Sequence, residues 1–133
     1  MTGASGGLGQ AIARGLARRG ADLVLSARRV EVLESVAAEI GGRVVPCDLA
    51  DRAAVERLVS QAGAVDVLIA NAGISVAGRV ERSSIEEIDR VLDVNLRAPI
   101  VLARLLCEGM AERGGGHIVF ISSLNGKVGT VRT

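Results

Sequence analysis

The sequence predicts an α/β fold in which a doubly wound parallel sheet carries helices on both faces. Short apolar runs of strand type alternate with helical patterns along the 133 residues. Strands and helices in this order pair in parallel through right-handed crossovers. No internal repeat, charge block or linker interrupts the alternation, so residues 1–133 are expected to form one domain.

A glycine-rich turn, MTGASGGLG, opens the chain and leads into a helical pattern. Its glycines, Gly3, Gly7 and Gly9, have the spacing G-x-x-x-G-x-G. Gly7 and Gly9 are expected to let a pyrophosphate approach the backbone N–H groups at the helix N-terminus. Thr2 and Ser5 add hydroxyls that either brace the turn or contact phosphate and ribose. Glycines that only bend the chain between two elements are the structural alternative.

The elements that follow repeat this alternation. The first helical pattern places Leu8, Ile12 and Leu16 on one apolar face. An apolar run over residues 21–27 predicts a buried strand, and residues 30–42 repeat the helical pattern.

Two further strands and two helix starts are predicted next. Residues 43–49 form a strand pattern in which Pro46 indicates an edge position or the strand exit. Asp51 is the expected N-cap of the next helix, and residues 65–73 form a buried strand that runs into a glycine turn. Ser84 and Glu87 have capping-box spacing at the start of a long helix that ends near ERGGG, and HIVFISS is the last strand.

The long helix carries an unfavourable pair of residues. Asn95 has poor helix propensity, and Pro99, four residues on, has no N–H to bond the Asn95 carbonyl. A kink is therefore expected, with that carbonyl free to hold a water. A purely structural kink is the alternative.

The sheet is expected to be incomplete at its start. A doubly wound domain places its first strand centrally, yet only Met1 precedes the glycine turn. Without that strand its neighbours would have to span two strand spacings, about 9–10 Å. We therefore expect a native-like arrangement in which the central slot is empty or poorly filled.

Composition excludes several classes of function. A net charge of +1 leaves no electrostatic footprint for nucleic acid or an acidic membrane, and no apolar run approaches the length of a membrane span. Phe120 is the only aromatic residue, so the core must be aliphatic. Cys47 and Cys107 lack metal-ligand spacing and are expected to be reduced, buried thiols in a cytoplasmic protein that holds no metal.

Four motifs in order carry a resemblance to a known family: TGASGGLG, ANAGI, VLDVNL and GGGHIVFISSLNG. Together they make the chain resemble the N-terminal half of the short-chain dehydrogenase/reductase family. The resemblance implies a Rossmann-like domain that binds NAD(H) or NADP(H). It also implies hydride transfer between the nicotinamide and a small carbonyl or alcohol substrate, in proteins that are homo-oligomeric at full length.

By position, the resemblance implies a set of cofactor-binding residues. Asp48 would hold the adenine amino group, although a plain loop carboxylate beside a helix is the alternative. The residues after the central strand would line the adenosine ribose and steady the sheet. The full set is Thr2, Gly3, Ser5, Gly7, Leu8, Gly9, Arg28, Asp48, Leu49, Asn71, Ala72 and Gly73.

The choice of cofactor depends on the end of the second strand, LVLSARR. A site that selects NAD places a carboxylate there for the ribose hydroxyls, whereas this chain has Ala27, Arg28 and Arg29. A guanidinium suits a 2′-phosphate. NADP(H) is therefore favoured over NAD(H), with Arg28 the better candidate; two solvated arginines at a helix start are the alternative.

The resemblance also implies catalytic residues. Ser123 matches the family's catalytic serine, whose hydroxyl would hydrogen-bond the substrate carbonyl or alkoxide. Asn95 matches an asparagine that anchors a water in the family's proton relay. Ser122 is expected to be structural, His117 a strand-start residue and not a base, and Lys127 a solvated charge.

The family's base is a tyrosine in the pattern Tyr-x-x-x-Lys, which would fall beyond Thr133, and the sequence contains no tyrosine. We therefore expect the front half of a dehydrogenase, clipped at both ends and inactive by itself. A non-catalytic nucleotide-binding module and a decayed gene product are the alternatives, and any dimer of this half is doubtful.

Overall fold

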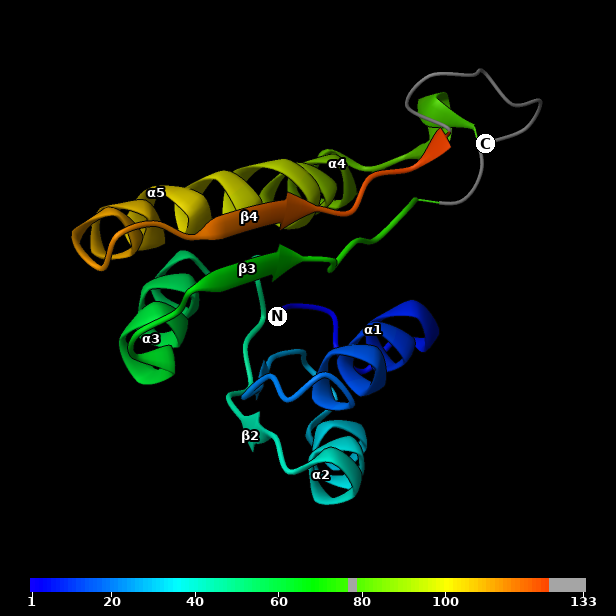
Figure 1. Ribbon diagram of the computed structural model, residues 1–133. Helices are drawn as coiled ribbons and strands as arrows, with labels where there is room; N and C mark the ends of the chain where they lie inside the picture. The colour runs from blue at the N-terminus through cyan, green and yellow to red at the C-terminus, as the bar shows by residue number, and fades with distance from the viewer. Residues whose placement is uncertain (77–78, 125–133) are drawn as a thin grey trace.

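Helices and parallel strands alternate along the computed structural model, which describes residues 1–76 and 79–124 (Figure 1). The elements are α1 (Gly7–Ala17), β1 (Val24–Leu25), α2 (Val30–Ile40), β2 (Arg43–Val44), α3 (Arg52–Ala62), β3 (Val67–Ala70), η1 (Val80–Arg82), α4 (Ile85–Leu92), η2 (Asp93–Arg97), α5 (Ala98–Glu112) and β4 (His117–Phe120).

The strands form two parallel pairs, β1 with β2 and β3 with β4, and the N-terminus lies between the pairs. Thr2 forms a single parallel bridge with Ser26, which directly follows β1. The Thr2 N–H donates to the Ile69 carbonyl of β3 at 2.9 Å, and the Ser26 N–H donates to the Met1 carbonyl at 3.0 Å. The order across the molecule is therefore β2, β1, residues 1–2, β3, β4. The sequence predicts a doubly wound sheet whose central slot is empty or poorly filled. The structure agrees, because a single bridge at Thr2 occupies that slot.

The core is aliphatic and forms two clusters, one under each layer of helices. Figure 1 shows α3, α4 and α5 gathered around β3 and β4. It shows α1 and α2 beside β2 and the N-terminal segment. The larger cluster includes Val55, Leu58, Leu68, Leu102 and Leu106. The smaller cluster comprises Ala4, Ala13, Leu25, Leu33, Val36 and Ala37. Each helix layer therefore has its own buried face.

One residue on the apolar face expected for α1 is not buried. Leu8 is 58% exposed, while Gly9 and Ala13 are the buried residues of this helix. A Cβ on Gly9 would lie only 2.1 Å from the Gly3 carbonyl oxygen, so the helix packs against the turn through its smallest side chains. Close packing of that kind turns the helix so that Leu8 faces outward.

The local helix signals are confirmed. The Asp51 carboxylate accepts from the N–H groups of Ala53 and Ala54 at 2.9 and 3.2 Å and caps α3. Ser84 and Glu87 form a reciprocal capping box at the start of α4, with distances of 3.1 and 2.9 Å.

The long helix expected after Ser84 is interrupted at Asn95, as predicted, and the interruption is a π-helical turn. Asn95 lies in η2, between α4 and α5, and Pro99 lies in the first turn of α5. At the end of η2 the Ala98 N–H donates to the Asp93 carbonyl, five residues back. Because Pro99 offers no N–H to the Asn95 carbonyl, the regular α-helical pattern cannot run through this segment.

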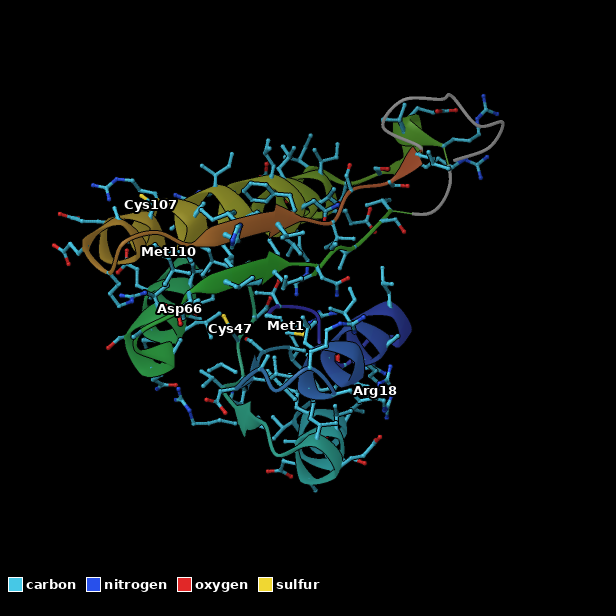
Figure 2. All side chains as sticks on the ribbon, in the orientation of Figure 1. Met1, Arg18, Cys47, Asp66, Cys107 and Met110 are labelled. Atoms are coloured by element: carbon cyan, nitrogen blue, oxygen red, sulfur yellow. The ribbon has the colours of Figure 1, made fainter. Side chains whose placement is uncertain are left out.

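The expectation of two buried thiols is wrong for one of them. Cys47 is 5% exposed, whereas Cys107 lies on the outer side of α5 and is exposed. Figure 2 shows Cys47 close to the centre of the molecule and Cys107 toward the end of α5.

Candidate functional site

A cleft of about 1200 Å³ lies along the carboxyl ends of the strands. Its walls come from the glycine turn, the segments that follow β1, β2, β3 and β4, and the junction of η2 with α5. Of the site residues predicted from sequence, only Thr2 does not line it. In open α/β sheets, ligands bind at this edge, so the topology brings the predicted residues to one place.

The glycine turn presents backbone donors without side chains in front of them. The N-cap residue of α1, Gly6, makes no side-chain cap, and no group among the described residues accepts from the first N–H groups of the helix. A Cβ on Gly7 would meet nothing within 4 Å. Gly7 therefore leaves the helix N-terminus open, a fit for a pyrophosphate, while Gly9 serves close packing against Gly3.

Thr2 braces the turn from behind the cleft. Its buried hydroxyl accepts from the N–H groups of Asn71 and Ala72, both at 3.2 Å. In return, the Asn71 side chain donates to the Thr2 and Gly3 carbonyls at 3.3 and 3.2 Å. Of the two roles open to the Thr2 hydroxyl, the structure has bracing, and it ties the turn to the end of β3.

The two arginines after β1 differ in their contacts. Arg29 donates to the Ser5 carbonyl at 2.6 Å and so supports the glycine turn. Arg28 makes no hydrogen bond to the described part of the chain and lines both the cleft and an adjoining pocket of about 420 Å³. Arg29 also lines the cleft, but Arg28 is the one of the two whose guanidinium is engaged by no hydrogen bond within the described residues.

Asp48 is held by a partner that the sequence did not reveal. Its Oδ2 and Oδ1 accept from Arg90 of α4 at 2.9 and 3.2 Å, and Oδ1 also accepts from the Ala50 N–H at 3.1 Å. Burial raises the pKa of Asp48, but the hydrogen bonds from Arg90 and Ala50, with the charges of Arg90 and Arg28, outweigh it and lower the pKa. The carboxylate is ionised at neutral pH and accepts only.

Asn95 connects η2 to the segment after β3. Its Oδ1 accepts from the Ile74 N–H at 2.8 Å, and its Nδ2 donates to the Ile74 carbonyl at 2.7 Å. The side chain is thus committed to the backbone of one residue on the cleft wall.

The residues around β4 divide between its two ends. Ser122 and Ser123 follow the strand, are exposed and line the cleft. His117 begins the strand at the opposite end, as predicted. Lys127 lies outside the described residues.

Cys47 lies under the cleft and under the adjoining pocket. Burial, followed by the charges of Asp48 and Asp51, raises the pKa of its thiol to about 11, although Arg57 acts in the other direction. Across residues 1–76 and 79–124, no group of acidic, histidine and cysteine side chains is placed to hold a metal ion. In those same ranges, no helix has the length and apolar character to cross a bilayer.

A doubly wound parallel sheet with an open glycine turn at its carboxyl edge defines a nucleotide-binding α/β protein of the Rossmann type. The chain belongs to the short-chain dehydrogenase family, whose family model matches residues 1–133.

Known relatives agree with this assignment. The chain is 45% identical to nodulation protein G of Rhizobium sp. (strain N33) over 135 residues, which cover 97% of this chain and 55% of that protein. It is 38% identical to the 3-oxoacyl-(acyl-carrier-protein) reductase FabG of Rickettsia conorii over 133 residues, covering 95% and 53%. The chain thus spans about half the length of these curated relatives.

A solved structure is similar over nearly the whole chain. It is a metagenomic short-chain oxidoreductase in complex with NADP, with 38% identity and a TM-score of 0.89. The match covers 98% of this chain and 64% of that one.

Proposed function

We propose that this chain binds NADP(H) in the cleft as the cofactor-binding part of an oxidoreductase. The whole protein would move hydride between the nicotinamide and a small carbonyl or alcohol substrate. The observation that supports this is the convergence on one cleft of an open helix N-terminus, the available Arg28, the Asp48 carboxylate and Ser123. The names of the similar FabG reductase and NADP complex point the same way.

The chain's own groups have distinct binding roles in this proposal. The N–H groups beside Gly7 would hold the pyrophosphate. Asp48 would accept from the adenine amino group, and the Leu49 N–H, which has no partner among the described residues, would donate to the neighbouring ring nitrogen. Arg28 would bind the 2′-phosphate, which separates NADP(H) from NAD(H).

The bound cofactor would supply the hydride, and two residues of this chain would assist the substrate. The Ser123 hydroxyl would donate to the substrate oxygen, where negative charge develops as the carbonyl is reduced. Asn95 would act through its backbone, at the π-helical turn, to hold a water of the proton relay. Its side chain would keep that turn in place through Ile74.

Turnover by these 133 residues alone is not expected. They contain no tyrosine, so they cannot supply the phenolic base that the resemblance implies. A non-catalytic nucleotide-binding module is the second candidate function, because the open helix N-terminus, Arg28 and Asp48 are groups that bind without reacting. The two candidates predict the same binding by this chain and differ only in the activity of the whole protein.

Calorimetric titration with NADP⁺ and NAD⁺ tests the proposal. We expect tighter binding of NADP⁺, with thermal stabilisation that grows with its concentration. Arg28→Ala should remove the preference, whereas the matched control Arg18→Ala, at the far end of α1, should keep it. Binding of neither dinucleotide would refute the proposal, and equal affinity for both would refute the NADP(H) assignment.

A further inference from the structure

We infer that Arg90 is a positioning residue that holds the Asp48 carboxylate as a hydrogen-bond acceptor. The cleft thereby selects adenine over bases that carry an acceptor oxygen where adenine has its amino group. The inference rests on the proposed function, because it concerns the base of the bound dinucleotide. Arg90 lies in the last turn of α4, 42 residues from its partner, and no motif in the sequence points to it.

The carboxylate of Asp48 is fixed from two sides. The Ala50 N–H holds Oδ1 from the loop itself, and the Arg90 guanidinium bonds both oxygens from α4. A carboxylate offers about four lone-pair positions, and these contacts occupy three of them, two on Oδ1 and one on Oδ2. One acceptor position on Oδ2 therefore remains for a ligand.

The free groups next to each other in the chain match one base edge. Asp48 contributes an acceptor, and Leu49 contributes an N–H without a partner in the described residues. Adenine presents a donor amino group beside an acceptor ring nitrogen, which is the complementary order. Hypoxanthine presents an oxygen and a ring N–H at these places. The Asp48 carboxylate would then face another acceptor and the Leu49 N–H another donor, so neither hydrogen bond could form.

The role of Arg90 in this selection is to hold the carboxylate of Asp48 ionised and in one orientation. A rotated carboxylate would remove its acceptor oxygen from the place of the adenine amino group. A protonated carboxyl has an O–H that could bond the hypoxanthine oxygen. The guanidinium is a charged group that only donates, so its two contacts from Nη2 favour the ionised form and hold its orientation. The lowered pKa of Asp48 is consistent with this.

A purely structural role, docking α4 onto the loop before α3, is the competing explanation. A second contact joins the same regions, because Arg52 at the start of α3 lies 3.8 Å from Asp93 of η2. The Asp48–Arg90 pair is partly exposed, 39% for each side chain, and Asp48 lines the cleft. The docking therefore does not depend on Arg90 alone, and the two roles can be separated by experiment.

The test compares the dissociation constants of NADP⁺ and its hypoxanthine analogue, measured by calorimetry on the 133-residue chain and its variants. We expect the unmodified chain to prefer NADP⁺ by about tenfold or more, as one or two well-placed hydrogen bonds allow. Arg90→Met should reduce that ratio by about threefold to tenfold. Arg90→Lys, which keeps a donor and the charge, should recover most of it.

The matched control is Arg14→Met, which breaks the Arg14–Glu39 pair of 2.7 Å on the surface of α1 and α2. It should leave the ratio unchanged. An unchanged ratio in a folded Arg90→Met chain would overturn the inference while leaving cofactor binding in place. Failure of the unmodified chain to bind NADP⁺ would instead overturn the proposed function, and the inference with it.

Folding of each variant is checked by circular dichroism. If Arg90→Met does not fold, Arg90→Gln, which has a shorter side chain but keeps a donor amide, takes its place. An intermediate ratio for Arg90→Gln supports the inference, and the ratio of the unmodified chain contradicts it.

Discussion

The side chain of Asn95 bonds the backbone of Ile74 at both of its polar atoms, at 2.8 Å to the N–H and 2.7 Å to the carbonyl. This relationship joins the π-helical turn η2 to the segment that follows β3. Two walls of the cleft therefore keep their spacing through one amide group.

Replacement of Asn95 should loosen that connection. Asn95→Ala removes both hydrogen bonds, and because the site is exposed we expect a loss of about 1–2 kcal/mol in the free energy of unfolding. Asn95→Asp keeps the acceptor but sets a carboxylate against the Ile74 carbonyl, so it should destabilise at least as much. Urea denaturation measures both. Midpoints equal to that of the unmodified chain would show that the contact contributes nothing.

Two glycines of the turn should respond in opposite ways to the same substitution. Gly9→Ala places a methyl 2.1 Å from the Gly3 carbonyl oxygen, so it should destabilise the fold by about 1–3 kcal/mol or prevent folding. Gly7→Ala meets no atom within 4 Å and should leave stability unchanged or slightly raised. Its methyl should instead weaken NADP⁺ binding. Melting temperatures and binding constants separate the two effects, and similar stability losses at both positions would contradict the assignment.

The two cysteines should differ strongly in reactivity. Cys107 is exposed, whereas Cys47 is buried and its thiol pKa is raised to about 11. At neutral pH, iodoacetamide should modify Cys107 first and Cys47 only slowly, because the thiolate is the nucleophile. Peptide mass mapping over time measures both rates. In the Cys107→Ser control, only the slow reaction should remain, and fast labelling there would contradict the burial of Cys47.

Asp48 should contribute to the acid sensitivity of the fold. Its pKa is lowered in the folded chain, so its contribution is present above the unfolded value of about 3.9 and is lost as the pH falls through the folded value. Below about pH 5, the urea midpoint of the unmodified chain should therefore fall more steeply than that of Arg90→Met.

Other carboxyl groups with lowered pKa values, Glu39, Asp51 and Glu86, are common to both chains and cancel in this comparison. Parallel curves between pH 3 and pH 7 would mean that Arg90 does not set the charge state of Asp48.

Much of the local structure could be predicted from the sequence, because its causes lie within a few residues. Asp51 caps α3 through N–H groups two and three positions away, and Ser84 and Glu87 bond each other. The interruption of the long helix follows from the missing N–H of Pro99. The motifs also named the residues that meet in the cleft, which lie after the strands, in the glycine turn or, for Asn95, in the π-helical turn.

Which side chains are buried depended on packing, and there one prediction, the burial of Cys107, was wrong. The pattern of α1 contains Leu8, Ile12 and Leu16 at helical spacing, but spacing alone does not say which side of a helix approaches its neighbours. The close approach of Gly9 to Gly3 decides it, and that approach leaves Leu8 exposed on the cleft. The outward position of Cys107 has a similar origin in the way α5 packs.

By itself, the sequence determined the alternation of elements, the helix starts, the glycine turn and the membership of a family, since these depend on neighbours along the chain. Only the tertiary structure decided that Arg29 supports the turn while Arg28, on the same cleft, makes no hydrogen bond within the described residues, and that Arg90 holds Asp48. Those contacts join residues 24 and 42 positions apart. Their geometry is set by how the helices pack on the two strand pairs, and neither spacing nor composition carries that information.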